Sequence, residues 1–223
     1  MRSLAYFLTL LALGLIQCKH HSEDKSDQAL KTDSLAYPVR KKMVAMYLFM
    51  PGIDTEQFFK DCKAWGVNMV YTNSTYWNKQ FLEKARLYGI EPGLLFPVFF
   101  NQDYLQAHPD DYCITSKGNR AIRDWLHFGC PSSERFRQHQ KEYLKKVLPE
   151  INASMVVFDF IRFYVHWESV SPAASFHEIE DGCYCERCLT DFEEYSGVSV
   201  AGKSPEWIKQ NALKQWTSWK CHV

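Results

Sequence analysis

The chain has 223 residues, of which 46% are hydrophobic and 15% aromatic, so it can bury the core of one sizeable domain. Lysine plus arginine and aspartate plus glutamate number 26 each, and no stripe of basic residues is evident. This balance gives no electrostatic footprint for nucleic acid, and we expect no nucleic-acid partner. Composition leaves the oligomeric state open.

Residues 1–18 are predicted to be an export signal. After a short positive start, residues 4–16 form an apolar run that is too short to span a bilayer and is typical of a signal-peptide core. The Leu-Ile-Gln-Cys sequence at 15–18 resembles a bacterial lipobox, although Gln17 replaces the usual small residue. We expect an exported protein that Cys18 anchors by lipid to a bacterial membrane, in the periplasm or at the cell surface. A plain cleaved signal or an uncleaved anchor is the alternative.

Residues 19–41 form a polar linker, and a domain with alternating strands and helices follows over 42–223. Apolar strands are predicted at 43–50, 67–73, 92–100 and 154–163, with an early strand end or a bulge at Pro97. Helices are predicted at 54–66, 78–88, 131–148 and 188–195, and a last one starts at 204. Asp54 and a serine near 133 are the expected N-caps.

This succession indicates a parallel sheet with helices on both faces. An open doubly wound sheet and a (β/α)8 barrel both satisfy it. No G-x-G-x-x-G follows the first strand, and the long loops after the third and fourth strands favour the barrel. A full barrel takes about 250 residues. We therefore predict an α/β domain of TIM-barrel type, truncated after about four βα units; a complete four-stranded domain is the alternative.

The predicted strand at 154–163 carries the candidate catalytic residues Asp159 and Arg162. A β-branched apolar run delivers this acid and this base to its carboxyl end, where α/β proteins bind ligands. Arg162 could keep Asp159 ionised if the strand has ended or twisted by that point, or it could bind substrate hydroxyls. The alternative is that Asp159 only holds neighbouring loops by hydrogen bonds.

Cys183, Cys185 and Cys188 form a C-x-C-x-x-C cluster in the next loop. Three thiols in one turn could bind a structural zinc ion with a fourth ligand. That ligand would be Cys130, Cys113 or a histidine such as His177. In an exported protein, disulfide bonds are the alternative to zinc. Cys183 or Cys185 would then pair with Cys188 or with Cys130. In either case the predicted role is to brace the loop, and no cofactor is expected for catalysis.

Four residues at or beyond the carboxyl ends of predicted strands are candidate contacts to a carbohydrate. Aromatic faces suit the CH faces of a sugar, and amides and hydroxyls suit its hydroxyl groups. The alternative is that strand-end aromatic residues close a layer of the core. The candidates are Tyr47, Asn73, Trp77 and Asn101.

Three segments resemble glycoside hydrolases of the TIM-barrel superfamily, in bacterial groups with a C-x-C-x-x-C loop after strand four. They are residues 158–163 (Phe-Asp-Phe-Ile-Arg-Phe), residues 125–132 (Trp-Leu-His-Phe-Gly-Cys-Pro-Ser), and the cysteine cluster with Phe192 behind it. The resemblance covers residues 42–220, the amino-terminal half of such a barrel. It implies hydrolysis of O-glycosidic bonds in a poly- or oligosaccharide, with Asp159 as nucleophile or transition-state stabiliser.

Glycosidases commonly need a second carboxylate, which in related barrels comes from a later strand. Within this chain the candidates are Asp103 and Glu168, both in loops at the carboxyl end of the predicted sheet. Two alternatives therefore stay open. The chain could be a non-catalytic carbohydrate-binding surface lipoprotein, or an inactive fragment of a disrupted gene.

Overall fold

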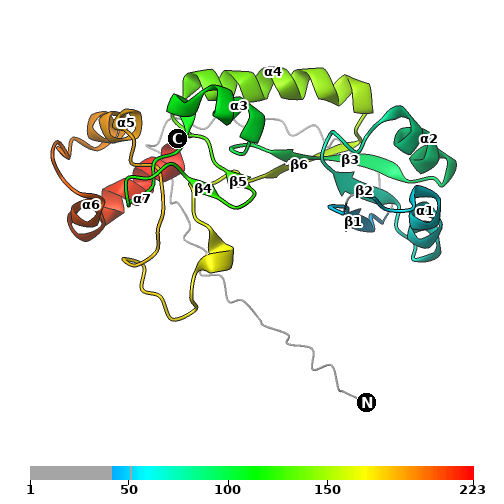
Figure 1. Cartoon of the computed structure of the whole chain (residues 1–223), viewed down its shortest axis with the longest axis horizontal. Helices are drawn as coiled ribbons and strands as arrows, with labels where there is room; N and C mark the ends of the chain where they lie inside the picture. Colours follow the sequence, from blue (N-terminus) through cyan, green and yellow to red (C-terminus); the bar gives the residue numbers. More distant parts are fainter. Residues whose placement is uncertain (1–41, 51) are drawn as a thin grey trace, which may run out of the picture. The chain divides into compact units, whose positions relative to one another are not determined.

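The computed structural model describes residues 42–50 and 52–223 (Figure 1). The predicted signal, the linker and the lipidation residue Cys18 lie outside these residues. Among the helices of the described ranges, none is both long enough and apolar enough to cross a bilayer.

Four parallel strands form the main sheet, in the order β1-β2-β3-β6. Their bounds are Ala45–Tyr47 for β1, Met69–Thr72 for β2, Glu91–Pro97 for β3 and Met155–Asp159 for β6. Each strand lies within a predicted one, apart from one residue at the start of β3, so the parallel α/β arrangement is confirmed. Within the described ranges these four strands form a sheet with β1 and β6 at its edges. The predicted TIM-barrel type is not confirmed, and the predicted truncation after about four βα units stays a prediction.

The helices that accompany the sheet are α1 (Thr55–Ala64), α2 (Lys79–Leu87) and α4 (Glu134–Ile151). The predicted caps are confirmed: the side chains of Asp54 and Ser133 accept the backbone N–H groups of Gln57 and Phe136. Apolar side chains of these helices pack on one face of the sheet. That cluster includes Phe59, Cys62, Phe81, Leu94, Phe96, Val147 and Ile151.

On the opposite face of the sheet, one residue from each of the four strands lies beside its partner on the neighbouring strand. In the register Tyr47 pairs with Tyr71, Tyr71 with Gly93, and Gly93 with Met155. The Tyr71 ring lies over Gly93, where an added Cβ would meet it at 2.4 Å. Because side chains alternate along a strand, Asp159 belongs to the same face as Met155.

The long excursion after β3 contains elements that the sequence pattern does not reveal. They are α3 (Gln102–Ala107), the short 3-10 helix η1 (Pro109–Asp111), and a hairpin of β4 (Ile122–Arg123) and β5 (Leu126–His127). Each hairpin strand has only two residues, which is too short for a periodic signal. The predicted early end of the third strand at Pro97 is confirmed.

After β6 the chain forms the 3-10 helix η2 (Trp167–Ser169) and then α5 (Glu186–Ser196), α6 (Pro205–Asn211) and α7 (Leu213–His222). The last three lie together, orange to red in Figure 1. They enclose a second large apolar cluster with the hairpin and the cysteine loop. Its buried members include Leu126, Phe128, Tyr164, Phe192, Ile208, Trp216 and Trp219.

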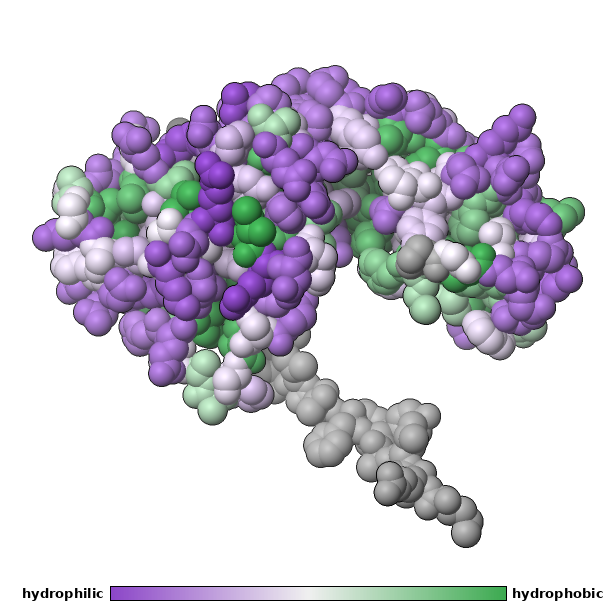
Figure 2. All heavy atoms as spheres, in the orientation of Figure 1, coloured by the Kyte–Doolittle hydropathy of each residue, from purple (hydrophilic) through white to green (hydrophobic). Residues whose placement is uncertain are grey.

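The surface in Figure 2 is largely hydrophilic, with small hydrophobic areas between polar side chains. This agrees with the collection of apolar side chains in the interior clusters. The second cluster is the one that surrounds the cysteines, because four of its buried members are Cys113, Cys130, Cys183 and Cys188.

Candidate functional site

Asp159 is the last residue of β6 and is half-buried. Its backbone carbonyl accepts a hydrogen bond from the N–H of Val98 at 2.8 Å, which holds the strand end to the segment after β3. Its side-chain Oδ1 accepts the N–H of Phe160, also at 2.8 Å. The structure thus places the carboxylate at the carboxyl edge of the sheet, as the sequence predicts.

Arg162 lies in the turn after β6, and its contacts are with that turn. Its Nη1 donates to the carbonyl of Val165 at 2.6 Å, and the guanidinium lies over the rings of Phe160 at 5.5 Å and Phe128 at 5.8 Å. Burial lowers its pKa, while the charges of Glu168 and Asp159 act in the opposite direction. Arg162 therefore stabilises the turn after β6, and its hydrogen bond and ring contacts are with that turn and with Phe128.

Of the four predicted sugar contacts, Tyr47 and Asn73 lie at or beyond strand ends with accessible side chains. Tyr47 is 51% exposed and stacks on Phe49, with ring centroids 5.6 Å apart. The Asn73 side-chain oxygen accepts the N–H of Thr75 at 3.1 Å and so stabilises the turn after β2.

Trp77 and Asn101 have structural roles, and the substrate contact predicted for Trp77 is not supported by its position. Trp77 is only 5% exposed, and its Nε1 donates to the carbonyl of Gly93 at 3.0 Å, because the indole fills the core beside α2. Asn101 caps α3 by accepting the N–H of Tyr104, and its amide donates to Gln140 at 2.9 Å. Both polar groups are already used inside the protein.

The candidate second carboxylates lie in different surroundings. Asp103 is exposed in the first turn of α3, where its negative charge interacts favourably with the helix dipole. Glu168 lies in η2, and its carboxylate is 3.4 Å from Nε2 of His166. The charge of Glu168 opposes the lowering of the Arg162 pKa by burial, so this acid interacts electrostatically with the loop after β6.

The thiols of Cys130, Cys183, Cys185 and Cys188 meet in one cluster, with all four sulfur atoms within 4.8 Å of one another. Cys130 Sγ is 3.5 Å from the sulfurs of both Cys185 and Cys188. Cys130 follows β5, Cys185 is the N-cap residue of α5, and Cys188 lies in its first turn. The structure therefore brings the three predicted cysteines together with the first of the proposed fourth ligands.

The geometry suits a metal ion. A disulfide requires sulfurs about 2.05 Å apart, whereas a tetrahedron with metal–sulfur bonds of about 2.3 Å has edges of about 3.8 Å. Hydrogen bonds from the neighbouring thiols, that of Cys130 first, lower the pKa of Cys185. The N–H of Ile114 donates to Cys183 Sγ at 3.3 Å and so orients this sulfur, as donors around metal ligands do. This cluster can bind a metal ion.

The other two proposed fourth ligands lie outside this cluster. His177 is exposed in the loop before the cysteines. Cys113 is fully buried behind the loop, where a Cβ added at Gly182 would come within 2.3 Å of its sulfur. The glycine before Cys183 is therefore required by the close approach of Cys113.

Two buried carboxylates hold the segments that carry the cysteines. Asp181, which precedes the cluster by two residues, is 5% exposed and binds Lys209 Nζ of α6 at 2.8 Å and Lys220 Nζ of α7 at 3.0 Å. The hydroxyl of Tyr184 donates to the same carboxylate. This ion-pair network fixes the cysteine loop to the last two helices.

Asp111 performs the same task on the other side of the cluster and is 1% exposed. Its carboxylate accepts hydrogen bonds from the Tyr104 and Ser133 hydroxyls and from Nε of Arg135, at 2.9, 2.7 and 2.8 Å. Its carbonyl accepts the N–H of Cys130. Burial opposes its ionisation, but its hydrogen-bond partners outweigh burial and hold its pKa below the ordinary value.

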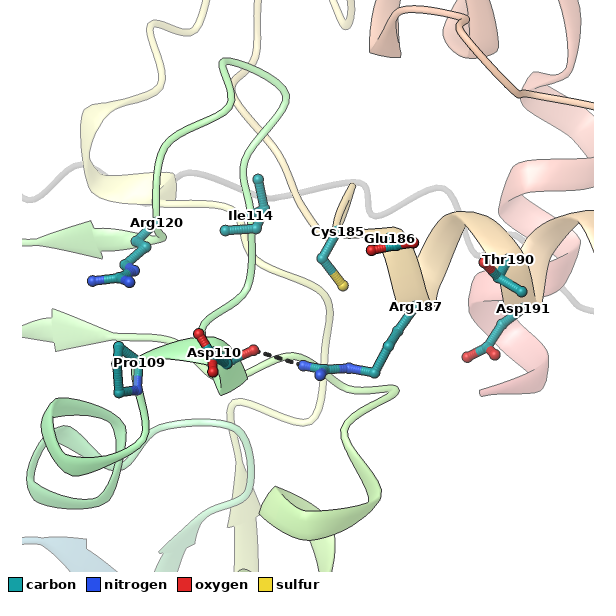
Figure 3. Close-up of a pocket in the computed structure, with 9 residues that line it drawn as sticks. All are labelled: Pro109, Asp110, Ile114, Arg120, Cys185, Glu186, Arg187, Thr190 and Asp191. Atoms are coloured by element: carbon teal, nitrogen blue, oxygen red, sulfur yellow. Dashed lines mark hydrogen bonds between the residues drawn. The ribbon is translucent and has the colours of Figure 1, made fainter.

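A cavity of about 560 Å³ lies beside the cluster, and Cys185 is part of its wall. Figure 3 shows Arg187 extending from α5 toward Asp110, whose carbonyl accepts a hydrogen bond from it at 2.8 Å. The other lining residues are Pro109, Ile114, Arg120, Glu186, Thr190 and Asp191. None of the lining residues belongs to β6, so this cavity is a different place from the edge that carries Asp159.

No protein-family model and no curated protein matches the chain. Two similar solved structures are β-galactosidases. The enzyme from the psychrophilic Marinomonas ef1 has a TM-score of 0.51 and 12% identity, over 79% of this chain and 28% of that one. The enzyme from the Antarctic haloarchaeon Halorubrum lacusprofundi has a TM-score of 0.50 and 14% identity, over 78% and 27%. The chain thus spans about a quarter of these enzymes and shares the fold of that part.

We predict that Asp111 makes the stability of the domain depend on pH in the acid range. Its folded-state pKa lies below an unfolded value of about 3.9, so its contribution is complete above that value and is lost as the pH falls through the folded pKa. Urea unfolding between pH 6 and pH 2 should show a smaller acid loss in Asp111→Asn than in the wild type. The exposed neighbour Asp110→Asn should behave like the wild type. Equal pH profiles for Asp111→Asn and the wild type would contradict this account.

Proposed function

We propose that this chain has a glycosidase-like function and acts on O-glycosidic bonds of a poly- or oligosaccharide. The observation that carries the proposal is the half-buried carboxylate of Asp159 at the carboxyl edge of a parallel sheet. The shared fold with parts of two β-galactosidases supports it at the level of the enzyme class. We further propose that β1, β2, β3 and β6 correspond to the first four strands of a (β/α)8 barrel.

In this proposal Asp159 acts as nucleophile or as stabiliser of an oxocarbenium-like transition state. The hydrogen bond from the Phe160 N–H holds its side-chain Oδ1 in place at the end of β6. Glu168 is the better candidate for the second carboxylate, because it lies in the loop after β6 and interacts with the charge of Arg162. Substrate contacts are proposed for Tyr47 and Asn73.

We predict that Asp159→Asn lowers the hydrolysis of aryl β-galactosides by about a thousandfold, because it removes a charge from the reacting centre. Glu168→Gln should also reduce hydrolysis, and Asp103→Asn should leave it unchanged. Rates of aryl release by the full-length protein measure all three. Equal rates in Asp159→Asn and the wild type would refute the assigned role. Sugar binding without turnover in the wild type would favour a non-catalytic carbohydrate-binding protein.

We also propose that the four thiols hold a structural zinc ion. The ligand set Cys130, Cys183, Cys185 and Cys188 would be closed, as in structural zinc sites, and zinc there would fold the loop without taking part in catalysis. The fit is supported by the sulfur–sulfur spacing, by the burial of three of the four cysteines, and by the N–H donor of Ile114.

The purified protein is expected to contain about one zinc ion per chain, measured by elemental mass spectrometry. Cys130→Ser should lose the metal and lower the Tm by roughly 10 °C, since each kcal/mol lost shifts the Tm of a domain of this size by about 2–4 °C. Cys62→Ala, which changes a buried cysteine of α1 outside the cluster, should keep its zinc. Full zinc content in Cys130→Ser would count against this ligand set.

We propose that Cys18 is lipidated after export and anchors the domain to a bacterial membrane. The support is the apolar run and the lipobox-like sequence before Cys18. Cells fed labelled palmitate should label the wild type, which should partition into detergent, whereas Cys18→Ala should do neither. Equal labelling of the two proteins would refute the anchor.

A further inference from the structure

Three aromatic rings from separate segments meet, and one of them belongs to Phe160, the residue that follows Asp159. Trp125 lies 6.0 Å from Phe160 and 6.2 Å from Phe100, and Phe100 and Phe160 are 6.0 Å apart. Phe100 follows β3, Trp125 forms the turn between β4 and β5, and Phe160 is the residue after Asp159. Trp125 is 52% exposed, while the two phenylalanines are half-buried.

The exposure of Trp125 has no explanation in packing. The turn between β4 and β5 has two residues, Asp124 and Trp125, and such positions usually carry small polar residues. Leu126, the residue after Trp125, is 1% exposed, and Phe128 is fully buried, so the hairpin is anchored in the core. An indole is thus presented to solvent on a fixed support.

Phe160 adopts an uncommon backbone conformation, which links the ring cluster to the candidate carboxylate. Its φ of 52° lies in the left-handed region, which bulky residues rarely adopt. The Asp159 side chain accepts its N–H, and the guanidinium of Arg162 lies 5.5 Å from its ring. The same turn therefore sets both the position of the carboxylate and the orientation of the ring, an arrangement typical of functional sites.

We propose that Trp125, supported by Phe100 and Phe160, is a stacking platform for a sugar ring next to Asp159. An indole face pairs with the CH face of a pyranose, and the adjoining carboxylate can accept hydrogen bonds from the sugar hydroxyls. The inference rests on the proposed function for the class of ligand. The proposal adds Trp125 to the candidate sugar contacts. This residue lies in the hairpin turn, and the pattern of strand ends in the sequence does not reveal it.

The test is binding of galactobiose, lactose and cellobiose to the full-length protein in the Asp159→Asn background, where turnover is removed. Saturation-transfer NMR detects contact, and isothermal titration gives the affinity. Trp125→Ala should weaken binding of the best ligand at least about tenfold, and Trp125→Phe should restore most of it. The matched control is Trp65→Ala, an exposed indole (64%) at the end of α1, which should bind normally. Thermal melting checks that each variant is folded.

Equal affinities of Trp125→Ala and its parent would overturn the platform and leave the proposed hydrolysis intact. Absence of binding for all three disaccharides would overturn it as well. Binding that depends on Trp125 in a protein that hydrolyses no glycoside would uphold the platform while the proposed catalytic function fails.

Discussion

Four thiols from two distant parts of the chain must lie within 4.8 Å of one another, and the loops at the carboxyl edge of the sheet depend on that constraint. Cys130 is 55 and 58 residues from Cys185 and Cys188. The cluster therefore joins the excursion after β3 to the loop after β6. Trp125 belongs to the first of these segments, and the second begins directly after Asp159, so the cluster joins the two segments that flank the proposed site.

The surroundings of the cluster are consistent with a site built for a bound cation. A buried thiolate is costly unless a metal ion or a hydrogen-bond donor compensates its charge, and Cys130, Cys183 and Cys188 are buried within the second apolar cluster. Asp111 and Asp181 hold the two approaching segments through charged hydrogen bonds, one to α4 and the other to α6 and α7. These ion pairs hold the two cysteine-bearing segments against the helices, and they fix the positions of those segments more firmly than the two-residue strands of the hairpin could do alone.

Local signals in the sequence predicted the sheet and most helices because caps and apolar periodicity act over a few residues. For the fourth ligand the sequence left Cys130, Cys113 and a histidine such as His177 open, since the choice depends on a contact across more than fifty residues. Residue type also failed to separate roles at strand ends. Trp77 fills the core and Asn101 caps a helix, whereas Trp125 is exposed in a hairpin whose strands are too short to leave a pattern.

X-ray absorption at the zinc edge decides whether the four thiols bind a metal ion, because it reports the atoms bound to the metal in the intact protein. We expect four sulfur atoms at about 2.3 Å from the zinc ion and no nitrogen or oxygen ligand. A protein that contains no zinc and shows disulfide-linked peptides from Cys130 and the 183–188 loop would contradict it. The loops would then be held together by covalent bonds between cysteines, and the structural role assigned to the metal would be wrong.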